Sequence, residues 1–139
     1  MHFSVVVPFT RSLDDVYALL SDVERRPEWQ GGLRAVELVG DPEPAVGQRW
    51  YDVLAFGPRP LMEVTELEHG KVWAEVGEWL GFVAGLRLEF APTGARETVV
   101  RANVTIAAPT WRHPVGWGMA AVGPEVVRRD LRTAASLLH

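Results

Sequence analysis

The sequence predicts an α+β domain in which an antiparallel sheet wraps around a helix and leaves room for a ligand between them. Three observations lead to this fold class. One strand and one helix precede the segment from Asp22 to Trp29, which holds an acidic helix end, a proline and a tryptophan. A run of strands follows this segment, and a last helix closes the chain. The length of 139 residues is the usual size of one domain.

The N-terminal elements are a strand and a capped helix. Residues 3–9 are apolar at every second position, which is typical of a strand with one buried face. Pro8 near its end indicates an edge strand or a bend. Ser12, followed by two aspartates, fits the N-cap of a helix over about residues 13–21. Pro27 cannot continue that helix, so a second short turn is expected over residues 28–30.

Further strands are expected after Gly32, separated by loops rich in glycine and proline. The last strand alternates most clearly between one buried face and one mostly solvated face. A turn over residues 92–95 separates it from the strand before it. The expected ranges are 35–39, 48–56, 61–67, 71–77, 82–90 and 98–106.

After Pro109 the periodicity becomes that of a helix. Pro114 fits its first turn, whereas Pro124 lies inside it and should kink the helix or split it in two. Glycine and alanine are frequent in the first half of this helix. Small side chains there let the sheet approach closely or leave space unfilled.

Composition excludes several classes of protein. The net charge is −4 with no strongly basic block, so nucleic-acid binding is not expected. No apolar run approaches the ~18 residues that span a bilayer, so no stable membrane insertion is expected. The first residues lack the features of a secretory signal, which favours a cytoplasmic protein. Because there is no cysteine, disulfides and cysteine-based metal or redox sites are impossible.

Neither a metal nor a cofactor is expected. The four histidines show no spacing typical of metal ligands. Residues 116–121 superficially match a dinucleotide-binding glycine motif. The chain after that motif is too short for the parallel strand that such a fold requires.

The N-terminal helix with Val16 and Tyr17, followed by Asp22, Pro27 and Trp29, resembles the polyketide cyclase/dehydrase-like branch of the START/Bet v 1-like (SRPBCC) superfamily. Glu24 in the same segment, residues 46–47 and the turn at residues 92–94 are similar to the pattern of that family as well. The resemblance implies a helix-grip fold. In this fold a curved antiparallel sheet of about seven strands, with two short helices after the first strand, grips a long C-terminal helix over a hydrophobic cavity.

The resemblance further implies that residues 1–139 form a single ligand-binding domain. The glycines and the proline in the final helix depart from the continuous helix usual in the family. No catalytic residue carries over, because the matching residues mark the corner between helix and sheet and not a reacting centre.

One strand brings polar groups to a possible cavity. In residues 48–56 either face carries a pair: Trp50 with Asp52, or Arg49 with Tyr51. A tyrosine and an arginine inside an apolar pocket could hold a carbonyl or an enolate oxygen, as aldol cyclisation requires. Alternatively, the charged members face water and the aromatic ring belongs to the core.

His113 precedes the final helix and is a second candidate for acid–base chemistry, because an imidazole titrates near neutral pH. The alternative is an exposed or capping histidine. The catalytic candidates are therefore His113, Tyr51 and Asp52.

The six tryptophans are more than a core of this size needs, so some are expected to line a cavity or a partner surface. The expected ligand-binding residues are Trp29, Arg49, Trp50, Tyr51, Trp73, Trp79, Trp117 and Met119.

Other charged residues are expected to lie on a solvated outer face. This interpretation covers four residues on neighbouring strands, and also two glutamates beside Gly77. The residues are Arg87, Glu89, Arg101 and Asn103, with Glu75 and Glu78.

Three functions remain open. The first is binding of a hydrophobic small molecule such as a lipid, a polyketide or an isoprenoid, by a monomer or a homodimer. The second is a polyketide aromatase/cyclase-type enzyme that uses the same cavity. The third is an interaction module with no ligand. A titratable group deep in the cavity would distinguish the second from the first.

Overall fold

The structure is a computed structural model that describes residues 1–109 and 113–138. The side chains at positions 113, 115, 116, 119 and 120 are not among those described. The elements in chain order are β1 (His2–Phe9), α1 (Leu13–Leu20), the 3₁₀ helix η1 (Val23–Glu28), β2 (Leu33–Val39), β3 (Arg49–Leu54), β4 (Leu61–Glu68), β5 (Val72–Trp79), β6 (Phe82–Gly94), β7 (Glu97–Ala107) and α2 (His113–Leu137).

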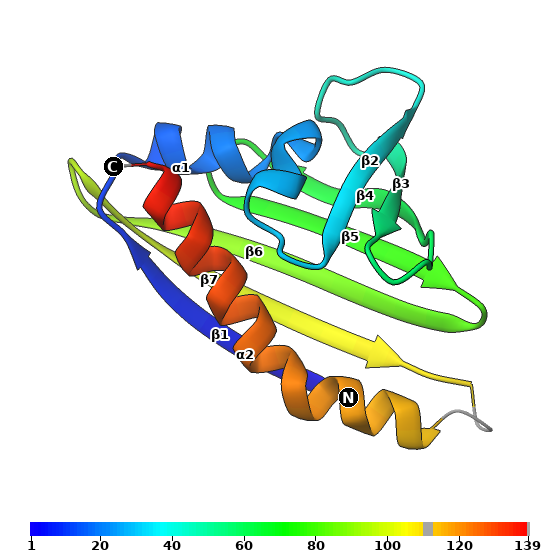
Figure 1. The fold of residues 1–139 in the computed structure, drawn as a ribbon. Helices are drawn as coiled ribbons and strands as arrows, with labels where there is room; N and C mark the ends of the chain where they lie inside the picture. The colour runs from blue at the N-terminus through cyan, green and yellow to red at the C-terminus, as the bar shows by residue number, and fades with distance from the viewer. Residues whose placement is uncertain (110–112, 139) are drawn as a thin grey trace.

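One curved antiparallel sheet holds seven strands in the order β1-β7-β6-β5-β4-β3-β2. The helices α1, η1 and α2 all lie over the same face of this sheet, and α2 runs along β1 and β7 (Figure 1). The core sits between the sheet and these helices, and it includes Val16, Leu20, Val100 and Leu131. The predicted α+β class and the sheet around a long helix are therefore confirmed. β1 is an edge strand, as Pro8 indicated.

The corner after α1 differs in detail from the prediction. Ser12 caps α1 by accepting a hydrogen bond of 3.3 Å from the amide N–H of Asp15. The short second helix begins at Val23 and not at residue 28, because the Asp22 side chain accepts a hydrogen bond from the Glu24 amide and starts a new helical turn there.

Most strands after β2 end one to four residues away from the predicted position, and the structure explains two of these differences. β3 stops at Leu54, because the chain turns back at once and the Leu54 amide bonds the Pro58 carbonyl. β6 continues through Pro92 to Gly94, where a register irregularity in its pairing with β7 accommodates the proline.

The helix α2 continues through Pro124 as one element, so the proline does not split it. Its C-terminal half is buried through Leu131 and Ala134, which are 1% and 0% exposed. At Gly123 a Cβ atom would lie 2.7 Å from the Phe3 ring, so glycine permits a close approach between α2 and β1. Val122 and Val126, near the middle of α2, are 62% and 41% exposed.

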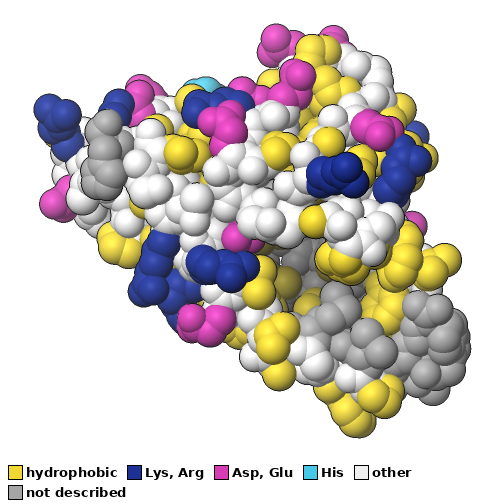
Figure 2. Space-filling view, in the orientation of Figure 1, with side chains coloured by type: hydrophobic (Ala, Val, Ile, Leu, Met, Phe, Trp, Pro, Cys, Tyr) yellow, Lys and Arg dark blue, Asp and Glu magenta, His cyan; other side chains and the backbone are white. Residues whose placement is uncertain are grey.

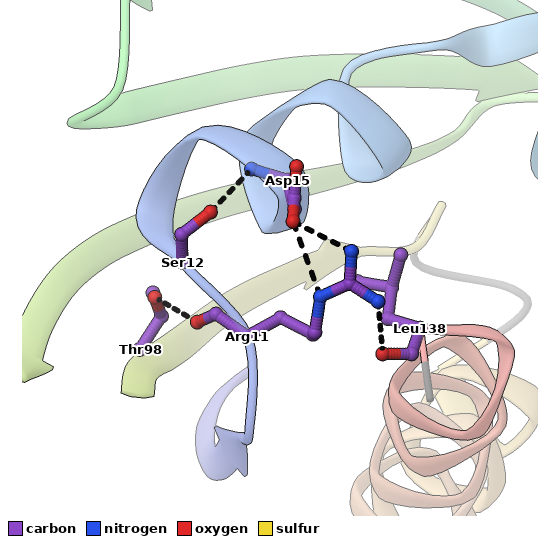
Figure 3. A network of polar contacts seen from close by, with 5 residues as sticks. All are labelled: Arg11, Ser12, Asp15, Thr98 and Leu138. Carbon is purple, nitrogen blue, oxygen red and sulfur yellow. Dashed lines mark hydrogen bonds and ion pairs between the residues drawn. The ribbon is translucent and has the colours of Figure 1, made fainter. Parts of the chain in front are cut away.

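Arg11 joins the C-terminal end of α2 to the corner between β1 and α1 (Figure 3). Its Nη1 atom donates a hydrogen bond of 2.7 Å to the Leu138 carbonyl, and its Nε and Nη2 atoms donate to the Asp15 carboxylate. The Thr98 hydroxyl of β7 donates to the Arg11 carbonyl. The last carbonyl groups of a helix have no hydrogen-bond partner within the helix, and Arg11 donates a hydrogen bond to one of them.

The outer face of the sheet carries the predicted charged pairs. Arg87 lies opposite Asn103, and Glu89 lies opposite Arg101, on β6 and β7. The Asn103 amide donates to Glu89 at 2.7 Å, and Arg87 pairs with Glu66 and Glu89. This interpretation is confirmed for these four residues.

Candidate functional site

A cavity of about 470 Å³ opens on the inner face of the sheet, over β3, β4, β5 and β6. Its wall is mainly apolar and includes Leu54, Phe56, Met62, Trp79 and Phe82. The volume lies in the range of small-molecule sites, roughly 300–1,000 Å³. The space-filling view shows a hollow between the body of the sheet and the N-terminal half of α2, with hydrophobic side chains at its rim (Figure 2).

Glycine at position 77 shapes the floor of the cavity. A Cβ atom there would lie 2.5 Å from the Met62 sulfur, closer than side-chain atoms approach one another. Gly77 therefore lets the Met62 side chain lie against the backbone of β5, and both residues line the cavity.

Among the described residues that line the cavity, Asp52 is the one with an ionisable side chain. It lies on β3, is 7% exposed, and accepts a hydrogen bond of 2.8 Å from the Trp50 indole N–H. Burial raises the pKa of the Asp52 carboxyl to about 6, and the negative charge of Glu75 adds to this effect. The positive charge of Arg26 and the Trp50 hydrogen bond act in the opposite direction. A carboxyl with this pKa can exchange a proton near neutral pH.

Behind Asp52 lies a buried arginine enclosed by three tryptophans. The Arg26 guanidinium is paired with the Glu75 carboxylate through two hydrogen bonds, and both side chains are almost fully buried. The rings of Trp29, Trp50 and Trp73 lie with their centroids 5.5, 5.7 and 5.8 Å from the guanidinium carbon. These distances are typical of cation–π contacts, which suit a weakly hydrated guanidinium.

Two strands present the same local motif to this arginine. On β3 the Trp50 indole donates to Asp52, and on β5 the Trp73 indole donates to Glu75 at 2.8 Å. Residues two apart on a strand share one face, so each indole N–H lies beside the carboxylate that follows it. The motif satisfies buried indole N–H groups and holds two carboxylates near Arg26.

The structure shows which face of β3 is turned inward. Trp50 and Asp52 face the interior, whereas Arg49 and Tyr51 lie on the opposite face of the strand. Arg49 is 47% exposed and pairs with Glu63 across the sheet. The Tyr51 ring lies 5.3 Å from the guanidinium of Arg59. The predicted ligand-binding roles of Arg49 and Tyr51, and the catalytic role of Tyr51, therefore have no support from their placement.

The other predicted site residues lie in different places. Trp29, Trp50 and Trp73 are core residues around Arg26, with 4%, 0% and 0% exposure. Trp79 lines the cavity, whereas Trp117 on α2 is 62% exposed. The side chains of His113 and Met119 lie outside the described residues, so their predicted roles stay predictions.

One prediction was wrong, and one residue was missed. Glu75 was expected on the solvated outer face, yet it is 4% exposed because it shares the inner face of β5 with Trp73. Glu78, which lies on the opposite face of β5, is exposed as predicted.

Arg26 was not predicted as a site residue. A sequence pattern could have predicted a buried cation. On two of the strands a tryptophan is followed two positions later by an acidic residue, and two acidic residues buried close together require a buried cation.

The comparison with protein families decides the classification. The family described as polyketide cyclase / dehydrase and lipid transport matches residues 1–138. The chain belongs to this family. A search of the curated proteins found no match.

Solved structures confirm the helix-grip fold of the START/Bet v 1-like superfamily. A START superfamily protein from Mycobacterium smegmatis has a TM-score of 0.79 at 15% identity, with 99% of each chain covered. Norcoclaurine synthase from Thalictrum flavum, in complex with dopamine and hydroxybenzaldehyde, has a TM-score of 0.76 at 13% identity, with 99% of this chain and 86% of that chain covered. The protein MLL2253 from Mesorhizobium loti has a TM-score of 0.73 at 20% identity, with 98% and 96% covered. At these identities the likeness shows the fold alone.

Within residues 1–109 and 113–138, no group of three or more acidic or histidine side chains is placed to hold a metal ion. In the same residues, no helix is both long enough and apolar enough to cross a membrane.

Proposed function

We propose that the chain acts as a single ligand-binding domain that takes a hydrophobic small molecule, such as a lipid, a polyketide or an isoprenoid, into the cavity on the inner face of the sheet. The observation that carries this proposal is the cavity itself, about 470 Å³ in volume with a mainly apolar wall. Removing apolar ligand surface from water stabilises the complex by roughly 25 cal/mol per Å² buried, before the entropy lost on binding is counted. Membership of a family described by cyclase, dehydrase and lipid-transport roles supports the same proposal.

A second function, a polyketide cyclase-type enzyme, is favoured by one specific observation. Asp52 lies in the cavity wall with a pKa of about 6. Ionised Asp52 would take a proton from the carbon between two ketone groups, and the resulting enolate would attack a third carbonyl. The carboxylic acid so formed would return the proton to the new alkoxide, so the enzyme would end in its starting state.

The binding proposal is tested by thermal shift with a panel of fatty acids, aromatic polyketides, isoprenoids and steroid-like compounds. A ligand at about 100 times its Kd adds about 2.7 kcal/mol to the free energy of unfolding, which raises the Tm by roughly 5–10 °C for a chain of this length. The matched variants are Ala84→Phe, which fills the cavity, and Val83→Phe, on the opposite face of the same strand. A shift lost only in Ala84→Phe supports the proposal.

Absence of a thermal shift with every class of compound in the wild-type protein would overturn the binding proposal and favour an interaction module without a ligand.

For the enzyme proposal, turnover of a poly-β-ketone substrate is compared between Asp52→Asn and Tyr51→Phe. Because Tyr51 lies on the other face of β3, only Asp52→Asn should abolish turnover. Equal turnover by both variants would remove Asp52 from the mechanism.

A further inference from the structure

The Asp52 carboxylate has unused capacity to accept hydrogen bonds. An ionised carboxylate offers about four acceptor sites. Among the described residues, the Trp50 indole is the side chain that donates to it, at 2.8 Å. Arg26 is committed to Glu75 through two hydrogen bonds, and no ion pair within the described residues joins Arg26 to Asp52. A ligand in the cavity is therefore placed to supply the missing donor.

The charges around Asp52 favour a cationic donor. Within residues 1–109 and 113–138, the charged groups that act on Asp52 are Arg26 of η1 and Glu75 of β5, and their charges cancel each other. Ionised Asp52 then gives this group of three buried residues a net negative charge, which is costly in a medium of low polarity. Among the described residues that line the cavity, neither lysine nor arginine is present. A positive charge on the ligand would restore neutrality.

The rest of the wall suits a cation attached to an apolar body. Phe56, Trp79 and Phe82 line the same cavity as Asp52. The faces of aromatic rings attract cations that have left water, and the rings also cover the apolar part of a ligand. A ligand carboxylate would meet the like charge of Asp52 instead.

We propose that this cavity selects hydrophobic amines, whose apolar body fills the cavity and whose protonated nitrogen donates to Asp52. The inference rests on the proposed binding function and narrows its ligand class. It predicts discrimination against fatty acids and other carboxylates. No covalent step is involved.

The selectivity depends on pH in a defined direction. Asp52 is ionised above about pH 6 and is protonated below it. An aliphatic amine stays protonated throughout the range from pH 5 to 8. The affinity for the amine should therefore fall as the pH drops through 6, whereas the affinity for a neutral alcohol of the same skeleton should stay nearly constant.

The experiment uses three probes with one skeleton: 2-naphthylmethylamine, 2-naphthylmethanol and 2-naphthoic acid. Their Kd values are measured by isothermal titration calorimetry at pH 5 and pH 7.5, with the wild-type protein and with Asp52→Asn, Ala84→Phe and Val83→Phe. At pH 7.5 the amine should bind about tenfold or more tighter than the alcohol, and the acid weakest. Asp52→Asn should remove this preference and its pH dependence. Ala84→Phe should weaken both the amine and the alcohol, and Val83→Phe neither.

The outcomes separate this inference from the proposal on which it rests. If the alcohol or the acid binds as tightly as the amine in the wild-type protein, and Ala84→Phe weakens it, the cavity binds ligands but the selection of amines is wrong. An amine preference that survives in Asp52→Asn, or that does not change between pH 5 and 7.5 in the wild-type protein, also overturns the inference. If none of the probes binds, the inference fails, and the wider ligand panel then decides whether the binding function fails with it.

Discussion

Replacing Asp52 with asparagine should stabilise the ligand-free protein at neutral and alkaline pH. Asparagine keeps the shape of the side chain and an oxygen that accepts the Trp50 hydrogen bond, but it removes a buried charge. The carboxyl has a pKa of about 6 in the folded protein and 3.8 ordinarily. At about 1.36 kcal/mol for each pH unit, ionised Asp52 destabilises the folded state by about 3 kcal/mol.

The sign of the pH dependence follows from proton binding. Between pH 3.8 and about 6, the folded state holds a proton on Asp52 that the unfolded state has released. The contribution of Asp52 to the free energy of unfolding therefore falls as the pH rises through this window. Below pH 3.8 both states hold the proton and the contribution is constant. Asp52→Asn should thus be more stable than the wild-type protein by about 1–3 kcal/mol at pH 8, and this advantage should shrink as the pH approaches 4.

The assay is urea denaturation followed by circular dichroism, at pH values from 4 to 8. The difference between the two proteins is the informative quantity, because other carboxyl groups titrate equally in both. Asp14→Asn, at an exposed position in the first turn of α1, is the control for loss of a charge, and its difference should stay within about 0.5 kcal/mol. A stability difference for Asp52→Asn that is independent of pH, or that favours the wild-type protein at pH 8, would refute the reasoning.

Three further variants test the packing of the charged core and of α2. Glu75→Gln should lower the free energy of unfolding by about 3–5 kcal/mol in urea denaturation, because Arg26 stays buried without its carboxylate; a loss below 1 kcal/mol would contradict this. Gly123→Ala should destabilise the protein by about 1–3 kcal/mol through its clash with the ring on β1, whereas Gly118→Ala, which meets no neighbour, should be neutral or stabilising by up to about 1 kcal/mol. Equal effects of the two alanines in thermal denaturation would argue against the close approach. Arg11→Ala should speed amide hydrogen exchange in the last turn of α2, with a loss of about 0.5–1.5 kcal/mol for the bond to the helix-end carbonyl, and unchanged exchange would count against that bond.

The fold could be predicted because its signals are local. Alternating apolar residues mark β1, β6 and β7, and the Ser12 cap marks the start of α1. The effect of Pro124 was harder to predict, because α2 continues through it as one helix. Whether a helix tolerates an internal proline depends on its tertiary surroundings as well as on its sequence.

The site was less predictable for a different reason. Both faces of β3 carry an aromatic and a charged residue, so hydrophobic alternation does not distinguish Trp50 and Asp52 from Arg49 and Tyr51. The inward position of Glu75 depends on Arg26, which lies 49 positions away in the sequence. The volume of the cavity depends on how all the surrounding side chains pack, so it cannot be predicted from any single residue.

The order of strands in the sheet has a consequence for how the chain is made. β1 pairs with β7, with His2 opposite Thr105 and Phe9 opposite Thr98. The strands from β2 to β7 each pair with the next strand in sequence, so they can assemble as successive hairpins. Among these seven strands, β1 is therefore made first but stays without its partner until β7 has been made. During that interval the unpaired strand makes the newly made chain prone to aggregation, which chaperones counteract.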